Sequence, residues 1–316
     1  MKYVGLQTQI WKNNIRSTIL LMMFPLVILG LAWLFIYFTR PEYYTIDDVT
    51  NTFLGVVPWL VAGVLVWFLI AWYANTSMIR RATGAKPLER KENKRVYNLV
   101  ENLTIAAGMK MPKVNIIEDN SLNAFASGIN NRTYTVTLSR GIINKLNDEE
   151  LESVIAHELS HIRNRDVRLL IVSIIFVGIF AFLVEIMLRS LFYSSMGRRR
   201  GGGGDGRGRA IAMLIALALA IAGFFITSLF RFAISRKREY MADAGAAQLT
   251  KRPRALASAL RKISGNSKIE AVSRKDVAQL FIDNPPEPKK DLFSFFNGLF
   301  ATHPPIEKRI AVLEQF

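Results

Sequence analysis

The chain has 316 residues, of which 51% are hydrophobic and none is cysteine, and its formal net charge is +16. Several apolar runs long enough to cross a bilayer exclude an ordinary soluble enzyme with one large core, and the absence of thiols excludes disulfides and thiolate metal sites. Because the positive charge lies beside apolar runs and is not interleaved with aromatic residues, we attribute it to anionic membrane lipids and topology, and not to nucleic acid.

Two membrane-spanning helices are expected near the N-terminus. The first apolar run covers residues 17–39 and the second covers residues 53–74, each about the ~20 residues that a helix needs to span the hydrocarbon layer. The first run is too long for a secretory signal and no small-residue cleavage site follows it. The loop at 41–52 is acidic, whereas the stretches before the first run and after the second are basic. The positive-inside rule therefore places the chain from residue 75 onward in the cytoplasm.

The pattern after these runs changes to that of a small α+β region. Residues 88–108 have apolar side chains at helical spacing and end on glycine, which predicts an amphipathic helix. Branched and aromatic residues then predict three short strands, over residues 114–117, 123–129 and 134–138. Asn130-Asn131 supplies turn chemistry between the last two strands.

The next helix carries the most specific pattern in the chain. Asn147 stands where an N-cap is expected, with Glu150 as its capping-box partner. Further along lie His157-Glu158-Leu159-Ser160-His161, an H-E-x-x-H pattern that uses two of the three histidines. Residues four apart share one helix face, so both imidazoles can reach a single metal ion while Glu158 turns toward the water that the metal carries. The pattern predicts a zinc-dependent hydrolase.

Two further apolar runs follow, over residues 167–188 and 210–230. The linker at 189–209 is rich in glycine and arginine and is expected to be a flexible, solvated loop. If both runs cross the membrane, this basic loop lies on the side that the positive-inside rule disfavours. Either the runs form a full hairpin that breaks the rule, or they lie partly buried against the rest of the protein. Their depth stays open. Near the end of the third run, a pair between Glu185 and Arg189 is favoured over a functional intramembrane carboxylate.

A catalytic zinc site needs a third protein ligand. Glu239 is the best candidate, and Asp243, one turn further on, could accept a hydrogen bond from the far ring nitrogen of a ligand histidine. A charged helix face explains the same spacing equally well, because three basic residues precede Glu239. Spacing alone does not decide between these readings.

Four segments of the chain together resemble the HtpX family of bacterial and archaeal membrane zinc metalloproteases, and nearly the whole chain shares the resemblance. These segments are residues 153–162, 235–243, 123–126 and 302–309. The family is similar to the prenyl-protein proteases of eukaryotes. The resemblance implies that His157, His161 and Glu239 bind one zinc ion per chain and that Glu158 is the catalytic acid/base.

The resemblance also implies the architecture and the role. The fold is expected to be α+β and mostly helical: a multi-span membrane protein with two membrane helices in residues 1–75 and a gluzincin-like zinc protease domain, with its small sheet, in residues 76–316. The hydrophobic segments 167–188 and 210–230 interrupt that domain. The expected function is cleavage of membrane or misfolded proteins in cell-envelope quality control, at the cytoplasmic side of the cell membrane.

In the expected mechanism, Glu158 takes a proton from the attacking water and passes it to the leaving amine. His303, the remaining histidine, lies in a proline-rigidified turn and is our hypothesis for the donor that stabilises the oxyanion. The same turn could simply start a helix. Residues Asn123, Ala124, Phe125 and Ala126 could form an edge strand with which an extended substrate pairs. An ordinary sheet edge is an equal alternative.

Two rival functions are less well supported. An intramembrane protease of the site-2 class also carries H-E-x-x-H, but in that class the motif lies within a membrane helix, whereas here it follows a polar, capped turn. A catalytically dead membrane scaffold is disfavoured because Glu158 is intact. The apolar residues at 292–300 are read as a packed core helix in preference to a segment that dips into the membrane surface.

Overall fold

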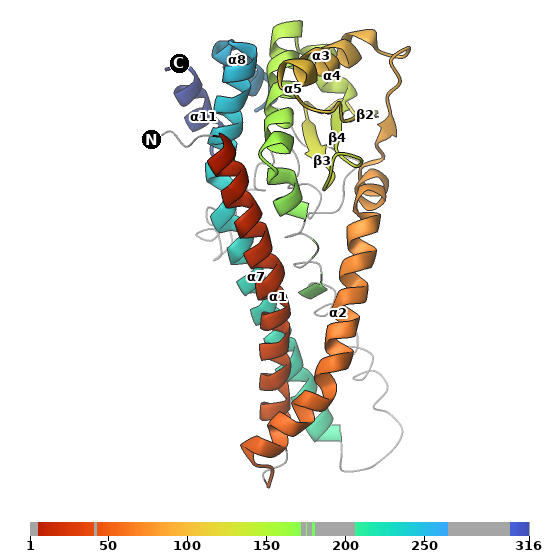
Figure 1. The fold of residues 1–316 in the computed structure, drawn as a ribbon, viewed down its shortest axis with the longest axis vertical. Coiled ribbons are helices and arrows are strands. Elements are labelled where there is room, and N and C mark those ends of the chain that lie inside the picture. Colours follow the sequence, from red (N-terminus) through yellow and green to blue (C-terminus); the bar gives the residue numbers. More distant parts are fainter. Residues whose placement is uncertain are drawn as a thin grey trace. The chain divides into compact units, whose positions relative to one another are not determined.

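The computed structural model describes residues 6–40, 43–171, 175, 179–180, 206–264 and 304–315. This part of the chain is mostly helical and contains one small mixed sheet (Figure 1). The chain divides into two compact units. One unit comprises Met1–Arg16, Ala74–Ile171 and Arg231–Phe316, and the other comprises Ser17–Tyr73 and Val172–Phe230.

The two N-terminal apolar helices are present, as predicted. Helix α1 covers Leu6–Thr39 and helix α2 covers Ile46–Thr83. Each contains a stretch long and apolar enough to cross a membrane, Met22–Thr39 in α1 and Ile46–Ile70 in α2.

Helix α2 begins earlier than the expected loop at 41–52 allows. The N–H of Thr45 donates to Asp48 Oδ2 over 2.8 Å, and the N–H of Asp48 donates to Thr45 Oγ1 over 3.2 Å. This reciprocal cap satisfies two N–H groups at the helix start and so fixes the beginning of α2 at Ile46.

The chain after the helix that carries the H-E-x-x-H pattern is also more helical than expected. Residues 166–171 are helical, and helix α7 runs without a break from Gly206 to Thr250. The expected loop at 189–209 is therefore wrong at its end, because residues 206–209 already belong to α7. Residues 189–205, most of 172–188 and the apolar group at 292–300 lie outside the described residues. Within the unit that comprises Ser17–Tyr73 and Val172–Phe230, Gly223 of α7 packs so closely on Phe180 and Leu31 that an added Cβ would lie 2.3 Å from a Phe180 ring carbon.

The sheet lies in the other unit and has the strand order β1-β2-β4-β3. Its strands are β1 (Lys86–Pro87), β2 (Lys113–Ile117), β3 (Ala124–Ser127) and β4 (Thr135–Ser139). Strands β2 and β4 are parallel, whereas β3 runs antiparallel to β4. The three strands expected from the sequence are confirmed with small changes of boundary, and the two-residue strand β1 was not predicted.

Helices cover this sheet and form the core of the unit. Helix α3 covers Lys94–Ala106 and starts six residues later than expected, because Asn93 caps it. The short helix α4, Arg140–Lys145, comes directly after β4. Helix α5, Asp148–Arg163, packs on β3, α3 and α8, and α11 packs on α8 (Figure 1). Helix α8 covers Pro253–Ile263 and α11 covers Ile306–Leu313.

The predicted capping box opens α5. The N–H of Glu150 donates to Asn147 Oδ1 over 2.9 Å, and the N–H of Asn147 donates to Glu150 Oε2 over 3.0 Å. Leu151, Ile155 and Leu159 are at most 1% exposed. Because the buried face of α5 is anchored in the core, the histidines on the same helix have a fixed position.

Candidate metal centre

Helices α5 and α7 bring together three side chains that can bind a metal ion. His157 and His161 lie one turn apart on α5, and their Nε2 atoms are 3.1 Å apart. Glu239 arrives from α7, with Oε2 3.6 Å from His157 Nε2 and Oε1 3.5 Å from His161 Nε2. One ligand atom from each residue lies within 4.8 Å of the other two.

This geometry and its charge fit a divalent cation. Nitrogen and oxygen ligands at ~2.0–2.1 Å from a tetrahedral zinc ion lie about 3.3 Å from one another, close to the three separations found here. Among the described residues around this group, four carboxylates and two guanidinium groups are buried: Glu158, Asp166, Glu239 and Asp243, with Arg238 and Arg309. With these six groups ionised and the histidines neutral, as metal binding requires, the surplus of negative charge is what a divalent cation would neutralise.

A carboxylate and a guanidinium support His157. Asp243 Oδ1 lies 2.9 Å from His157 Nδ1, on the side of the ring away from Glu239. Arg309 Nε and Nη2 donate to the two carboxylate oxygens of Asp243 over 2.9 and 2.7 Å. Burial alone would raise the pKa of Asp243, but Arg309 and His157 outweigh it and hold this pKa at about 2. Burial alone would lower the pKa of His157, but Asp243 and Glu239 raise it to about 9.

Arg309 was missed in the sequence analysis. It is fully buried, and its guanidinium also lies 3.5 Å from Glu239 Oε2 and 3.4 Å from His157 Nε2. One signal could have revealed it. Arg309 occupies the apolar stripe of α11, at helical spacing with Ile306, Ile310 and Leu313. An arginine at a core position needs a buried carboxylate.

A second carboxylate, also missed, supports His161. Asp166 Oδ2 lies 3.1 Å from His161 Nδ1, and Asp166 is 3% exposed. Asp166 follows Arg165, which has the left-handed φ of 59°. Helical periodicity could not point to this pair, because the chain leaves the α5 helix between the two residues.

Glu158 is buried beside the metal-binding group. The backbone N–H of Ala126 in β3 donates to its carboxylate. Burial raises the pKa of Glu158, while the neighbouring His157 and His161 oppose the rise. A carboxyl group with a raised pKa next to a metal site is suited to accepting and returning a proton.

Strand β3 contains three of the residues expected to bind substrate, and Asn123 precedes it. In the described sheet β3 is an edge strand, yet Asn123, Ala124, Phe125 and Ala126 are at most 4% exposed. The N–H of Ser139 donates to Asn123 O, so in this antiparallel pair the backbone of Ala124 and Ala126 points away from β4. The N–H of Ala124 is bonded to Asn123 Oδ1 over 2.8 Å. The substrate-binding role stays a prediction.

His303 lies outside the described residues, and its role also stays a prediction. The chain is described again from Pro304, and α11 begins at Ile306 without a side-chain cap.

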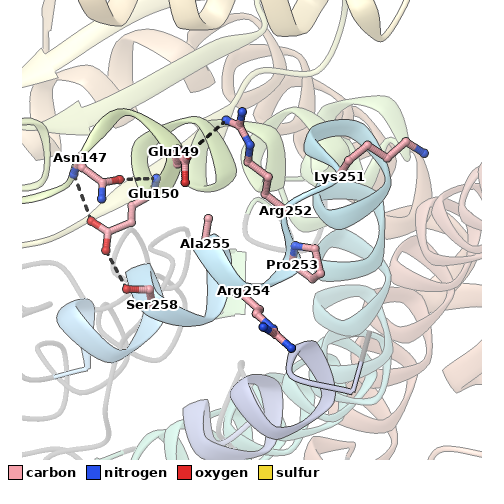
Figure 2. Close-up of a pocket in the computed structure, with 9 residues that line it drawn as sticks. All are labelled: Asn147, Glu149, Glu150, Lys251, Arg252, Pro253, Arg254, Ala255 and Ser258. Carbon is pink, nitrogen blue, oxygen red and sulfur yellow. Dashed lines mark hydrogen bonds and ion pairs between the residues drawn. The ribbon is translucent and has the colours of Figure 1, made fainter.

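A separate hollow of about 540 Å³ lies between the N-terminal ends of α5 and α8 (Figure 2). Its nine lining residues are Asn147, Glu149, Glu150, Lys251, Arg252, Pro253, Arg254, Ala255 and Ser258. None of them belongs to the metal-binding group. The charged side chains pair largely with their neighbours: Arg252 contacts Glu149 and Glu152, and Ser258 donates to Glu150. This hollow is therefore not the candidate site.

Comparison with known proteins identifies the family of this chain. The profile of peptidase family M48 matches residues 90–316. The chain is 60% identical to a protease HtpX homolog from Bacteroides fragilis, over the full length of both. It is 42% identical to a protease HtpX homolog from Listeria innocua, over 83% of this chain and 90% of the relative.

One solved structure supports the fold. Ste24p from S. mikatae superposes with a TM-score of 0.50 and 18% identity, covering 97% of this chain and 67% of the other. The family match and the full-length relatives confirm the resemblance stated from the sequence. The chain belongs to peptidase family M48 and is a metalloprotease.

Proposed function

We propose that the protein is a zinc-dependent endopeptidase of the cell membrane that cleaves membrane or misfolded proteins in cell-envelope quality control. The observation that carries this proposal is the convergence of His157, His161 and Glu239, whose ligand atoms lie within 4.8 Å of one another, beside the buried Glu158. Two imidazoles and one carboxylate are the ligand set of a common class of catalytic zinc site, which leaves one position open for water.

Zinc at such a site acidifies water and polarises the scissile carbonyl group. Glu158 is the residue that takes the proton and delivers it to the leaving amine. The N–H of Ala126 donates to its carboxylate and so restricts the directions in which this carboxylate can point. Asp243 holds the ring of His157 through Nδ1, which leaves Nε2 for the metal.

The proposed substrate is an extended polypeptide. The outward backbone of Ala126 is adjacent to Glu158, so a substrate strand paired along this edge of β3 would bring its peptide bonds close to the catalytic carboxylate. Backbone pairing reads little side-chain identity and therefore suits a protease with broad tolerance. In this structure the N–H of Ala124 is bonded to Asn123 Oδ1, so substrate pairing there exchanges that bond for a new one, whereas the N–H of Ala126 stays with Glu158.

The proposed topology is multi-pass, with the metal centre on the cytoplasmic side. Helix α2 has Asp47 and Asp48 in its first turn and Arg80 and Arg81 in its last. This charge difference favours a cytoplasmic position for the C-terminal end of α2, from which the unit with the metal-binding group continues. Membrane lipids are therefore proposed as partners of the apolar helices.

The decisive experiment compares the native chain with Glu158→Gln in detergent, by zinc content and casein cleavage. Glu158→Gln should keep about one zinc per chain and lose cleavage by about 10²-fold or more. Glu152→Gln is a matched control, since Glu152 lies on the same helix and pairs with Arg252. It should leave both properties unchanged. Equal cleavage by native and Glu158→Gln chains would refute the proteolytic assignment.

The ligand set is tested by Glu239→Ala. Removal of one of three ligands should abolish stoichiometric zinc binding. Undiminished zinc in this variant would refute the proposed site.

A further inference from the structure

Each of the two imidazoles in the metal-binding group has its own buried carboxylate behind it. His157 Nδ1 faces Asp243, which α7 supplies. His161 Nδ1 faces Asp166 at 3.1 Å, and the Asp166 side chain is 4% exposed against 14% for that of His161. Asp166 is not part of the H-E-x-x-H motif, and its separation from His161 Nδ1 is that of a hydrogen bond.

The backbone must leave the helix to make this second contact. In an unbroken α-helix, a residue five positions after His161 lies about 140° around the axis and cannot face the same ring. Here α5 ends at Arg163, the N–H of Asn164 donates to Ser160 O, and Arg165 adopts φ 59°. The left-handed conformation is disfavoured for a residue with a Cβ, so other contacts must hold it in place.

One such contact comes from the helix that supplies the third ligand. Arg238 Nη1 donates to the backbone oxygen of Asp166 over 3.1 Å, and Arg238 is 5% exposed. The next residue along α7 is Glu239. The position of Asp166 is therefore tied to the same turn of α7 that brings Glu239 to the two imidazoles.

We propose that Asp166 is a positioning residue that holds His161 in the orientation and tautomer needed to bind the metal. A neutral imidazole carries its proton on one nitrogen only. A carboxylate facing Nδ1 keeps the proton there and leaves the lone pair of Nε2 for the cation. This inference rests on the proposed function, because it assigns a role relative to the metal.

The small number of histidines makes the proposal directly testable. The chain has three histidines, so labelling with ¹⁵N-histidine gives three pairs of ring-nitrogen signals, and His303→Phe identifies one pair. The experiment uses the full chain with Glu158→Gln, zinc-loaded in detergent. Asp166→Ala should change the Nδ1 signal of one ligand histidine, and Asp243→Asn should change that of the other. Altered signals from both histidines in Asp166→Ala would indicate a merely structural role and overturn the proposal.

Zinc affinity, measured by competition with a chromophoric chelator, provides a second readout. Asp166→Ala should weaken zinc binding about 10–100-fold. Asp166→Asn keeps an oxygen that can accept from Nδ1–H and should weaken it less. Glu152→Ala removes a carboxylate from α5 at a distance from the metal-binding group and should leave zinc affinity unchanged.

The outcomes separate this proposal from the proposed function. If Asp166→Ala binds zinc as tightly as its parent and leaves all histidine signals unchanged, Asp166 has no positioning role while the zinc site stands. If Asp166→Ala does not fold, Asp166→Asn decides: because the hydrogen bond from Nδ1–H to a neutral amide is weaker than that to a carboxylate, a zinc affinity and a His161 signal that both equal those of the parent overturn the proposal. If the parent itself binds no zinc, the proposed function fails and this inference fails with it.

Discussion

Arg309 and Asp243 form a buried, bidentate ion pair directly behind His157, one of the three proposed metal ligands. Two guanidinium nitrogens lie 2.9 and 2.7 Å from the two carboxylate oxygens, and the residues are 0% and 2% exposed. Asp243 belongs to α7 and Arg309 to α11, so the pair joins the last described helix to the helix that supplies Glu239. Packing of α11 and orientation of His157 therefore depend on the same contact.

Replacing Arg309 by Met should destabilise the protein strongly, because it leaves the carboxylate of Asp243 in the interior without its cation. Breaking a buried pair in this way costs about 3–5 kcal/mol. Thermal unfolding of the Glu158→Gln chain in detergent measures the effect without self-cleavage. Arg261→Met is the control, since Arg261 pairs with Glu314 at the surface and such pairs contribute about 0–1 kcal/mol. Equal unfolding temperatures for the two variants would contradict a structural role of the buried pair.

Glu150 should stabilise the start of α5 in a pH-dependent way. Besides capping, its carboxylate accepts from Ser258 and Lys262, both over 2.7 Å. Burial raises the pKa of Glu150, but the bonds to Lys262, Ser258 and Asn147 outweigh it and leave this pKa below its ordinary 4.5. The contribution to stability is therefore present above pH 4.5 and lost as the pH falls through the lower folded-state pKa.

Glu150→Ala should cost about 1–3 kcal/mol at pH 7, from the lost cap and lost hydrogen bonds. Unfolding curves of variant and parent, recorded at pH 7 and at decreasing pH, should converge in acid. Glu149→Ala is the control, because Glu149 is a more exposed neighbour on the same turn. A stability difference that stays constant down to the lowest pH would show that the charge of Glu150 contributes nothing.

Local sequence rules predicted the elements whose cause is local. The capping box of Asn147 and Glu150 fixed the start of α5, and branched and aromatic residues located β2, β3 and β4. Strand β1 escaped prediction because its two residues, Lys86 and Pro87, are ordered by pairing with β2 and have no strand pattern of their own. The start of α2 was misjudged because the reciprocal cap of Thr45 and Asp48 was overlooked.

The metal-binding group was predictable only in part, because only two of its members are placed by local structure. His157 and His161 are placed by one helical turn, whereas Glu239 could be brought to them only by tertiary folding, and spacing left its role open. Asp166 and Arg309 were not predicted. Asp166 was missed because the left-handed Arg165 before it breaks the helical periodicity. Arg309 was missed because its position depends on the packing of α11, a helix from a distant part of the sequence.

The hypothesis for His303 gives a prediction that separates catalysis from metal binding. His303→Phe should lower casein turnover about 10²–10³-fold, the usual effect of removing one donor to the oxyanion. Zinc content should stay at the native level, because the three proposed ligands remain. Turnover is to be measured beside zinc content in the same preparation. Unchanged turnover would remove His303 from the mechanism, and lost zinc would make it a part of the metal site.

The loop between β3 and β4, residues 128–134, should control the position of Glu158. Gly128 has φ 100°, and a Cβ there would lie 2.3 Å from the backbone oxygen of Thr133, so Gly128→Ala must displace the end of β3. Since Ala126 in this strand donates to Glu158, the proposed catalytic carboxylate should lose its orientation while the histidines on α5 keep theirs.

Gly128→Ala should therefore lower turnover more than zinc content and destabilise the chain by about 3 kcal/mol. Gly108→Ala is a matched control: its φ is 62° and nothing lies within 4 Å of the added Cβ, so only the backbone strain is introduced. This strain costs about 1 kcal/mol and should leave turnover at the native level. If both alanine variants lose turnover equally, general destabilisation explains the loss, and the link from β3 to Glu158 is not needed for catalysis.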